Sequence, residues 1–189
     1  DNASDDGSSE IIQRHAAEDS RIRVYRHEHV MTALANFRFV FEQTSANFFM
    51  WAACDDRRSQ DYVEHMLNAL LARPDASLSF GNLADFSDLN QWREASLTPH
   101  EFETNPKQSW RERVVWITRS KGHHIYGLIR KSALMSYEWL DIIDVHNDVP
   151  LNVHLVLSGE LVRATGGCFY YYRPEVKKTH EASSLMNNL

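Results

Sequence analysis

The sequence has few cysteines and no long apolar run. Its 189 residues include 2 cysteines, Cys54 and Cys168, too few for a disulfide framework or a zinc motif built on cysteine pairs. A single bridge between them stays open at this point. No segment approaches the ~18 consecutive apolar residues that a membrane-spanning helix needs. We therefore expect a soluble protein with no membrane partner and of unknown compartment, with the cytoplasm slightly favoured.

Glycine motifs and nucleophile motifs are also absent. The 7 glycines form neither a dinucleotide-binding fingerprint nor a phosphate-binding loop. There is no Gly-x-Ser-x-Gly nucleophile elbow, and neither cysteine lies in a recognisable catalytic context. These absences argue against nucleotide-dependent chemistry and against nucleophilic catalysis. We expect no cofactor and no metal site.

A strong positive charge is missing as well. The net charge is −6, and it is uneven: residues 1–109 carry 10 Lys/Arg and 18 Asp/Glu, whereas residues 110–189 carry 10 and 8. Neither part is basic enough to indicate a nucleic-acid partner. The acidic part is typical of a solvated helical surface.

Aromatic residues, by contrast, are plentiful. The chain has 9 Phe, 7 Tyr and 5 Trp within a hydrophobic content of 43%, which excludes a disordered protein and can fill a core or line a cavity. Its length suits one domain. We expect a single domain over residues 10–176, between a flexible acidic tail at 1–9 and a flexible polar tail at 177–189.

The first part of the chain has helical periodicity. A cap at Ser8 or Ser9 predicts a first helix. A long helix is predicted over residues 30–51, because its apolar side chains recur at intervals of three, four or seven. A third helix is predicted over 59–73, where Pro74 ends it.

The pattern changes at Ser109. From there the chain alternates in short runs separated by turn residues, which predicts an antiparallel sheet. The third of these runs also fits a helix through 132–143, and Gly166-Gly167 fits either a tight hairpin or a glycine bulge. The predicted strands lie at residues 110–117, 124–130, 137–145, 151–157, 161–165 and 168–172.

Together these elements predict an α+β domain, with N-terminal helices packed on a curved, mainly antiparallel C-terminal sheet built from residues 108–173. The element order resembles the cone-like fold of cystatin-like and nuclear-transport-factor-two-like proteins, in which a bent sheet wraps around a long helix. Such folds serve isomerases, dehydratases, secretion-complex subunits and dimerisation modules, so the resemblance does not choose a function. The expected core residues are Phe37, Phe41, Phe48, Trp51, Met66, Leu67, Val114, Trp116, Val153 and Leu155.

Three polar residues carry the catalytic hypothesis. Asp144 and His146 lie two positions apart, so they share a face if the strand continues that far, and His154 follows across a turn. A carboxylate beside an imidazole orients it and raises its basicity, as general-base catalysis needs. We predict His146 or His154 as the base and Asp144 as its orienting partner. The alternative is a solvent-facing strand end.

Two other histidine groups have simpler interpretations. His27 and His29 share a face only in an extended segment, and no recognised zinc spacing is present, so a polar loop is favoured. His123 and His124 follow a turn and, with Tyr126, fit a site for an anionic group. A solvated hairpin tip is the favoured alternative.

The sequence thus supports two functional hypotheses. The first is a small-ligand pocket between sheet and helices, lined by aromatic residues that include Tyr126, Trp116 and Tyr170, which catalyses proton transfer as an isomerase or dehydratase does. The second is a non-catalytic interaction or dimerisation module that uses a sheet face. The expected partners are a small molecule, a protein or a second copy of the chain. Whether the protein is an enzyme stays open.

Overall fold

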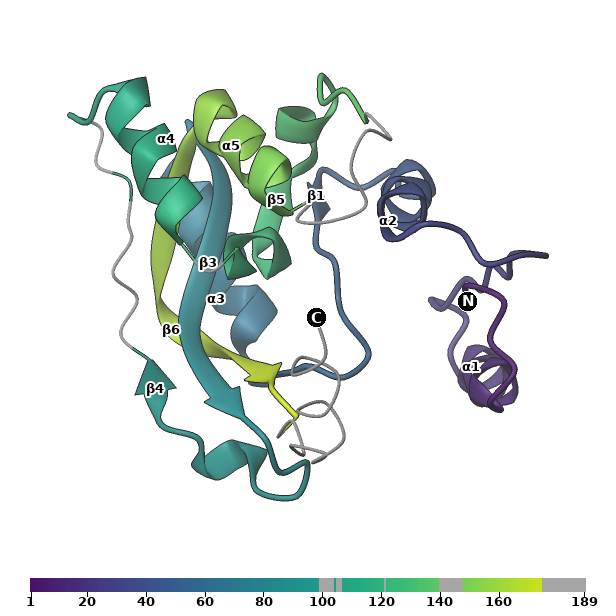
Figure 1. Ribbon diagram of the computed structural model, residues 1–189. Coiled ribbons are helices and arrows are strands. Elements are labelled where there is room, and N and C mark those ends of the chain that lie inside the picture. The colour runs from purple at the N-terminus through teal and green to yellow at the C-terminus, as the bar shows by residue number, and fades with distance from the viewer. Residues whose placement is uncertain (99–103, 105–106, 121, 140–147, 175–189) are drawn as a thin grey trace, which may run out of the picture.

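The computed structural model describes residues 1–98, 104, 107–120, 122–139 and 148–174. Within these residues one sheet has the strand order β1-β5-β3-β6-β2, with β4 paired to β3 off this path (Figure 1). The strands are β1 (Phe48–Phe49), β2 (Arg57–Arg58), β3 (Ala76–Phe86), β4 (Leu97–Thr98), β5 (Leu128–Arg130) and β6 (Glu160–Tyr172). The α-helices are α1 (Ser8–Glu18), α2 (Ala33–Glu42), α3 (Tyr62–Ala72), α4 (Trp110–Arg119) and α5 (Asp148–Ser158), and the short 3-10 helices are η1 (Trp92–Glu94), η2 (His123–Tyr126) and η3 (Lys131–Leu134).

The centre of the sheet is a parallel pair. β3 and β6 run parallel, whereas the pairs β1–β5, β3–β5, β3–β4 and β2–β6 are antiparallel. Parallel neighbours need a long crossover, and here the connection from β3 to β6 passes through α4 and α5. The sheet is therefore mixed, and the expectation of a mainly antiparallel sheet is wrong.

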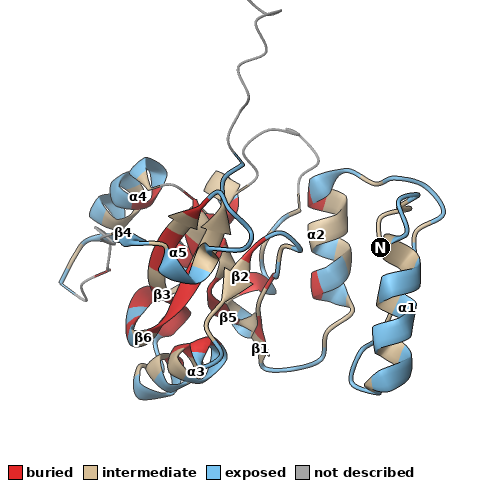
Figure 2. Ribbon diagram, turned by 90° about the horizontal axis from the view of Figure 1, so that it is seen from below, coloured by how far each residue is buried: buried red, intermediate tan, exposed pale blue. Residues whose placement is uncertain are grey.

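Two apolar cores lie on opposite faces of this sheet. α3 covers one face, where its buried Met66 and Leu70 pack with Val162 of β6. α4 and α5 cover the other face, where Leu155 of α5 packs against Leu78 of β3 (Figure 2). A sheet covered on both faces has strands that are apolar in both directions, as β3 is.

Ser109 begins a helix and not a sheet. Its hydroxyl accepts the Glu112 N–H at 3.4 Å, and the Glu112 carboxylate accepts the Ser109 N–H at 2.7 Å, which makes a capping box. The strand expected at 110–117 is therefore wrong, because this segment is α4. The half-buried Arg113 and Val114 and the buried Ile117 face inward, while Trp116, expected in the core, is 44% exposed.

The strand expected at 151–157 is also a helix, α5. It begins at Asp148 and holds Pro150 in its first turn, where the missing N–H of proline costs nothing. Buried Leu151 and Leu155 are four residues apart, a spacing that both a helix and an alternating strand allow. This ambiguity explains why the periodicity was misleading.

β3 was not predicted, because every expected strand lay after Ser109. The last two expected strands are one strand, β6, and its register against β3 shifts between Phe80 and Asn82. Gly167, at φ +76°, takes a left-handed conformation within this irregularity. The hairpin alternative for Gly166-Gly167 is thus wrong, because both glycines lie within one continuous strand whose register is irregular there.

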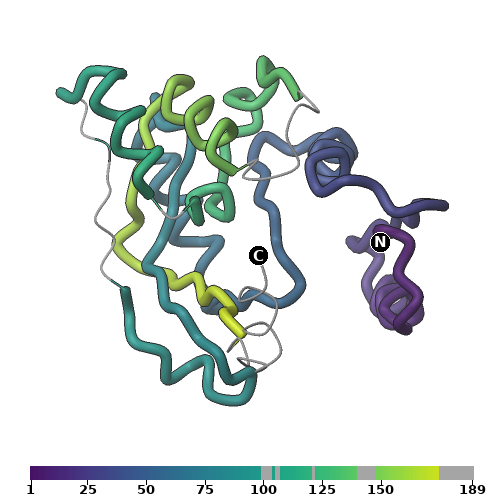
Figure 3. Tube along the Cα trace, viewed as in Figure 1, coloured from purple at the N-terminus to yellow at the C-terminus, as the bar shows by residue number. Residues whose placement is uncertain are grey.

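The N-terminal helices are shorter or less buried than expected. α2 ends at Glu42 instead of continuing to residue 51, and β1 follows it. The expected α3 is confirmed, and α1 forms with no buried residue. Figure 3 shows that α1 and α2 lie to one side of the sheet, so no long helix is wrapped by it and the cone-like order is not confirmed.

The expected core is partly confirmed. Phe41, Trp51, Met66 and Leu155 are buried. Both cysteines are free thiols, so no bridge joins them. None of the described helices is long and apolar enough to cross a membrane. The half-buried members of the expected core are Phe37, Phe48, Leu67, Val114 and Val153.

Candidate functional site

Two adjacent carboxylates follow the apolar segment that includes β1. Asp55 is exposed, whereas Asp56 is only 7% exposed. The Asp56 Oδ1 accepts the Tyr172 N–H at 3.0 Å, which ties this turn to the end of β6. The Oδ2 of Asp56 is buried and has no hydrogen-bond partner among the described residues. A buried carboxylate oxygen without a partner is costly, and such atoms mark sites that bind something.

Arginines surround this carboxylate pair. The Arg57 guanidinium donates to the Asp56 carbonyl at 2.9 Å, and Arg58 donates to the Trp51 carbonyl at 3.0 Å. Arg58 also lies 5.0 Å above the Phe169 ring, a cation–π contact, and burial lowers its pKa. Burial likewise raises the pKa of Asp56, against the opposing effect of the Tyr172 N–H and both arginines.

Tyr126 lies between this loop and α5. Its ring stacks on Phe169 with centroids 5.4 Å apart, and the Tyr62 hydroxyl donates to its carbonyl at 3.5 Å. Burial raises the pKa of Tyr126 to about 12, and the negative charges of nearby Asp56, Asp148 and Asp55 add to the rise. Three carboxylates from two separate segments thus act on one phenol.

Asp148 reaches the site from the first turn of α5, where the helix dipole favours a negative charge. It packs directly on Gly122, whose φ of +81° suits glycine. A Cβ at that position would collide with the Asp148 carboxylate. The backbone before η2 is therefore shaped to leave room for this side chain.

The position of the site follows a general rule for open sheets that contain parallel strands. Asp56 pairs with the carboxyl end of β6, and the His123 ring stands 4.3 Å from Tyr171 on the same strand. Ligands in such sheets bind at the carboxyl ends of the parallel strands. The Asp55–Asp56 turn, Tyr126 and Asp148 all converge on this end.

The carboxylate pair meets one requirement for a divalent cation. Among the described residues no group of three or more His, Cys, Asp or Glu is arranged around a metal position. Mg²⁺, however, is commonly held by one or two carboxylates together with substrate phosphates, and does not need a cage of protein ligands. The unpartnered Oδ2 of Asp56 beside the exposed Asp55 fits that type of site.

The catalytic residues expected from the sequence are not brought together within the described structure. Asp144 and His146 lie outside the described residues. His154 lies on α5, where its Nε2 is 2.8 Å from the Ala133 carbonyl and its ring contacts Tyr137. It links α5 to η3 and lies within the helical layer.

The expected ligand-binding aromatics also separate. Tyr126 lies in the site described above. Tyr170 alternates with Phe169 and Tyr171 along β6, so it faces the opposite side of the sheet, where its ring is 4.9 Å from Trp92. Trp116 lies on α4, with its side chain exposed.

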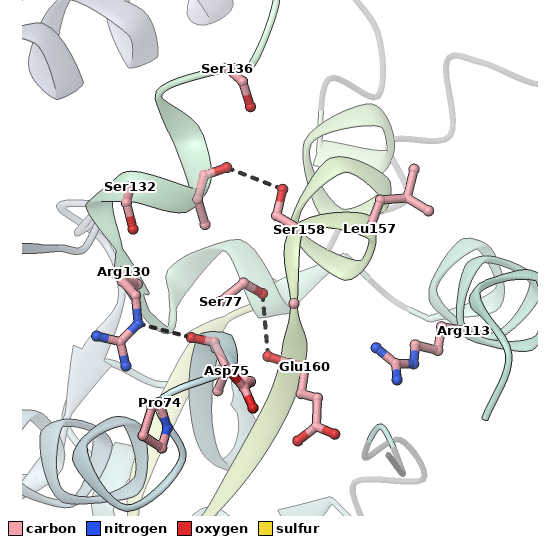
Figure 4. A pocket seen from close by; sticks show the side chains of 13 residues that line it. Pro74, Asp75, Ser77, Arg113, Arg130, Ser132, Ser136, Leu157, Ser158 and Glu160 are labelled. Carbon is pink, nitrogen blue, oxygen red and sulfur yellow. Dashed lines mark hydrogen bonds between the residues drawn. The ribbon is translucent and has the colours of Figure 1, made fainter. Parts of the chain in front are cut away.

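A cavity of about 720 Å³ lies at the other end of the central strands. It opens between the first residues of β3 and β6, and Figure 4 shows Arg113 of α4 and Ser158 of α5 around it. The Arg130 Nε donates to the Ala76 carbonyl there at 3.1 Å. The cavity is at the amino ends of the parallel strands, so it is separate from the Asp55–Asp56 site.

The comparison with known families identifies the chain. The model for "Glycosyl transferase family 2" matches residues 1–140. The chain belongs to glycosyl transferase family 2. The match includes Asp55, Asp56 and Tyr126 and ends before Asp148. No curated protein matches the chain.

Membership of family 2 overturns both hypotheses drawn from the sequence. The match points to a glycosyl transferase, so the isomerase- or dehydratase-like pocket and the dimerisation module are wrong. A small-molecule partner was expected, and the family implies such partners in the form of a sugar donor and an acceptor.

The sequence did carry a signal for this site. Asp55-Asp56 directly follows the apolar run from Phe48 to Cys54, which begins with β1. Asp148 lies two positions after His146, next to the group for which catalysis was expected. A carboxylate pair at the end of a short apolar run is a weak signal alone, since it is equally typical of an ordinary solvated turn.

Proposed function

We propose that the protein transfers a glycosyl residue from an activated donor, with a phosphate-containing leaving group, to an acceptor hydroxyl. The observation that carries the proposal is the convergence of Asp55, Asp56 and Asp148 around Tyr126 at the carboxyl ends of the parallel strands. The family match supports the reaction class. Carboxylates in two separate positions supply two chemical roles, one for each substrate.

Asp55 and Asp56 form the donor side. They are the residues that would hold a divalent cation, which neutralises the charge on a phosphate leaving group when bound. Arg58 adds a fixed positive charge beside them. The aromatic wall of Tyr126 and Phe169 excludes water from one side of this position.

Asp148 forms the acceptor side. The acceptor oxygen attacks the anomeric carbon, and the bond from that carbon to the leaving-group oxygen breaks with its electron pair. The Asp148 carboxylate takes the proton of the attacking hydroxyl, as a general base does.

The two roles are separable by experiment. The protein is incubated with a panel of nucleoside-diphosphate sugars and Mn²⁺ or Mg²⁺, and release of the nucleoside diphosphate is measured. We expect Asp148→Asn to lower turnover by roughly 100-fold or more with donor binding retained. We expect Asp56→Asn to lose donor binding itself, measured by calorimetry.

The matched control is Asp75→Asn, an exposed carboxylate that directly precedes β3 and so lies at the amino ends of the parallel strands, the other end of the sheet from both roles. It should keep full activity. Wild-type protein that releases no nucleoside diphosphate from any donor, or an Asp56→Asn variant with normal donor binding, contradicts the proposal.

A further inference from the structure

α4 presents an unusual outer surface. Ile117 faces the core at 3% exposure, while Trp110, Val115 and Trp116 are 60%, 47% and 44% exposed. Arg111 and Arg119 are exposed on the same helix. We call these five exposed side chains the α4 surface. Monomeric proteins rarely expose two tryptophans on one short helix, because the apolar area is costly in water.

The charge of this segment opposes that of the rest of the protein. Residues 107–121 carry 5 Lys/Arg and 1 Asp/Glu, whereas the remaining chain carries 15 and 25. The one acid, Glu112, is engaged in the cap of α4 through its bonds to Ser109. Among the described residues neither Arg111 nor Arg119 forms an ion pair. Residues 107–121 therefore sum to +4 and the other residues to −10, and among these cations Arg111 and Arg119 are exposed on α4 whereas Arg113 faces inward.

α4 lies at the margin of the molecule, with one side open to solvent. Figure 1 shows α4 at the margin of the molecule, outside α5, and Figure 2 shows its outward turns as exposed. Only its inner side packs on α5 and the core.

We propose that the α4 surface docks the protein on an anionic lipid membrane. Helices that bind in the membrane interface combine Lys/Arg with tryptophan and lie parallel to the surface, with apolar side chains inserted about 5–10 Å. Tryptophan prefers this region because its ring is apolar and its N–H is polar. This contact is peripheral, and it is compatible with the absence of a spanning helix among the described residues.

The tryptophans distinguish a lipid surface from other acidic partners. A nucleic acid or an acidic protein needs the arginines, and its binding is lost at high salt. Insertion into lipid needs Trp110 and Trp116 as well. The proposal therefore requires that both kinds of side chain contribute.

The experiment is co-sedimentation of the full chain with vesicles of phosphatidylcholine, with and without a quarter phosphatidylglycerol. We expect binding to the anionic vesicles and little binding to the neutral ones. The double variant Arg111→Glu with Arg119→Glu should bind at least ~10-fold more weakly, because each basic residue near a charged membrane contributes appreciably. The double variant Trp110→Ala with Trp116→Ala should also bind several-fold more weakly, and brominated lipid should quench wild-type tryptophan fluorescence.

The matched control is the double variant Arg14→Glu with Arg23→Glu, which makes the same charge change at exposed positions near α1. It should bind as the wild type does, and circular dichroism checks that every variant is folded. Equal binding to both vesicle types, or no binding at all, overturns the proposal. Full binding by either α4 variant overturns it too, and full binding by the tryptophan variant alone points to a polyanion as the partner.

Discussion

Asp56 is the most buried carboxylate of the site. Its carboxylate is 7% exposed, one oxygen has no partner among the described residues, and burial raises its pKa. Buried carboxylates with a raised pKa cluster at functional sites. A ligand that binds the unpartnered oxygen removes part of the cost of burying the charge. Gly122 is the complementary case, since its lack of a side chain makes room for Asp148.

The raised pKa of Asp56 has a definite effect on stability. Below its ordinary value of 3.8 the group is protonated in both states. As pH rises from 3.8 through the raised folded value, the unfolded chain ionises first, so stability falls. We expect Asp56→Asn, which keeps the acceptor for the Tyr172 N–H, to gain stability relative to the wild type as pH rises through this window.

Urea unfolding of both proteins at several pH values measures this difference. Mn²⁺ with a nucleoside diphosphate should raise the melting temperature of the wild type and not of the variant, because only the native site binds. A stability difference that is constant with pH would mean that the buried charge carries no penalty.

Gly122 gives a second prediction, with Gly7 as its matched control. Both take a left-handed backbone, at φ +81° and +85°, so alanine should cost about 1–2 kcal/mol at either position. Only at Gly122 does the new Cβ meet Asp148, whose flexible carboxylate can move aside. We expect Gly122→Ala to lower turnover strongly and Gly7→Ala to leave it unchanged, measured by nucleoside diphosphate release. Similar activities for the two variants would place Asp148 outside the reaction.

At the scale of elements, the sequence pattern in the second half of the chain fits both a helix and a strand. Residues 151–157 alternate well enough for a strand, yet Asp148 and Pro150 in the first turn and the packing of Leu151 and Leu155 on the sheet make them a helix. Ser109 is similar, because its capping box with Glu112 is a local helix signal that the alternation concealed. Local caps were more informative here than periodicity.

Two leucines of α5 distinguish its helix from the expected strand. Leu155 and Leu157 would share one face of a strand, but in α5 they are 0% and 54% exposed. We expect Leu155→Ala to cost roughly 2–5 kcal/mol of unfolding free energy and Leu157→Ala less than about 1 kcal/mol. Denaturant unfolding measures both, and equal losses would support the strand.

At the scale of the whole molecule, stability is uneven. α1 and α3 each have 11 residues, yet α1 buries none, whereas α3 buries Tyr62, Met66 and Leu70. The central β3–β6 pair is covered on both faces. Segments with few buried contacts open locally at a small fraction of the global free energy.

Amide hydrogen exchange should therefore be fast in some helices and strands and slow in others. We expect the amides of α1 to exchange rapidly and those of α3, β3 and β6 only through near-global unfolding, measured by native-state exchange with mass spectrometry. α3 is the control of equal length. Comparable protection of α1 and α3 would show that α1 is held by contacts stronger than its exposure indicates.

The sequence by itself determined the features that depend on near neighbours. The charge distribution, the presence of α1 and α3, and the irregularity at Gly166-Gly167 follow from composition, spacing and backbone preference. The tertiary structure alone decided that β3 and β6 pair in parallel. It also decided that Asp55, Asp56 and Asp148 lie near enough to Tyr126 for their charges to raise its pKa. These are contacts between residues tens of positions apart, and their register depends on burial against partners that no local pattern contains.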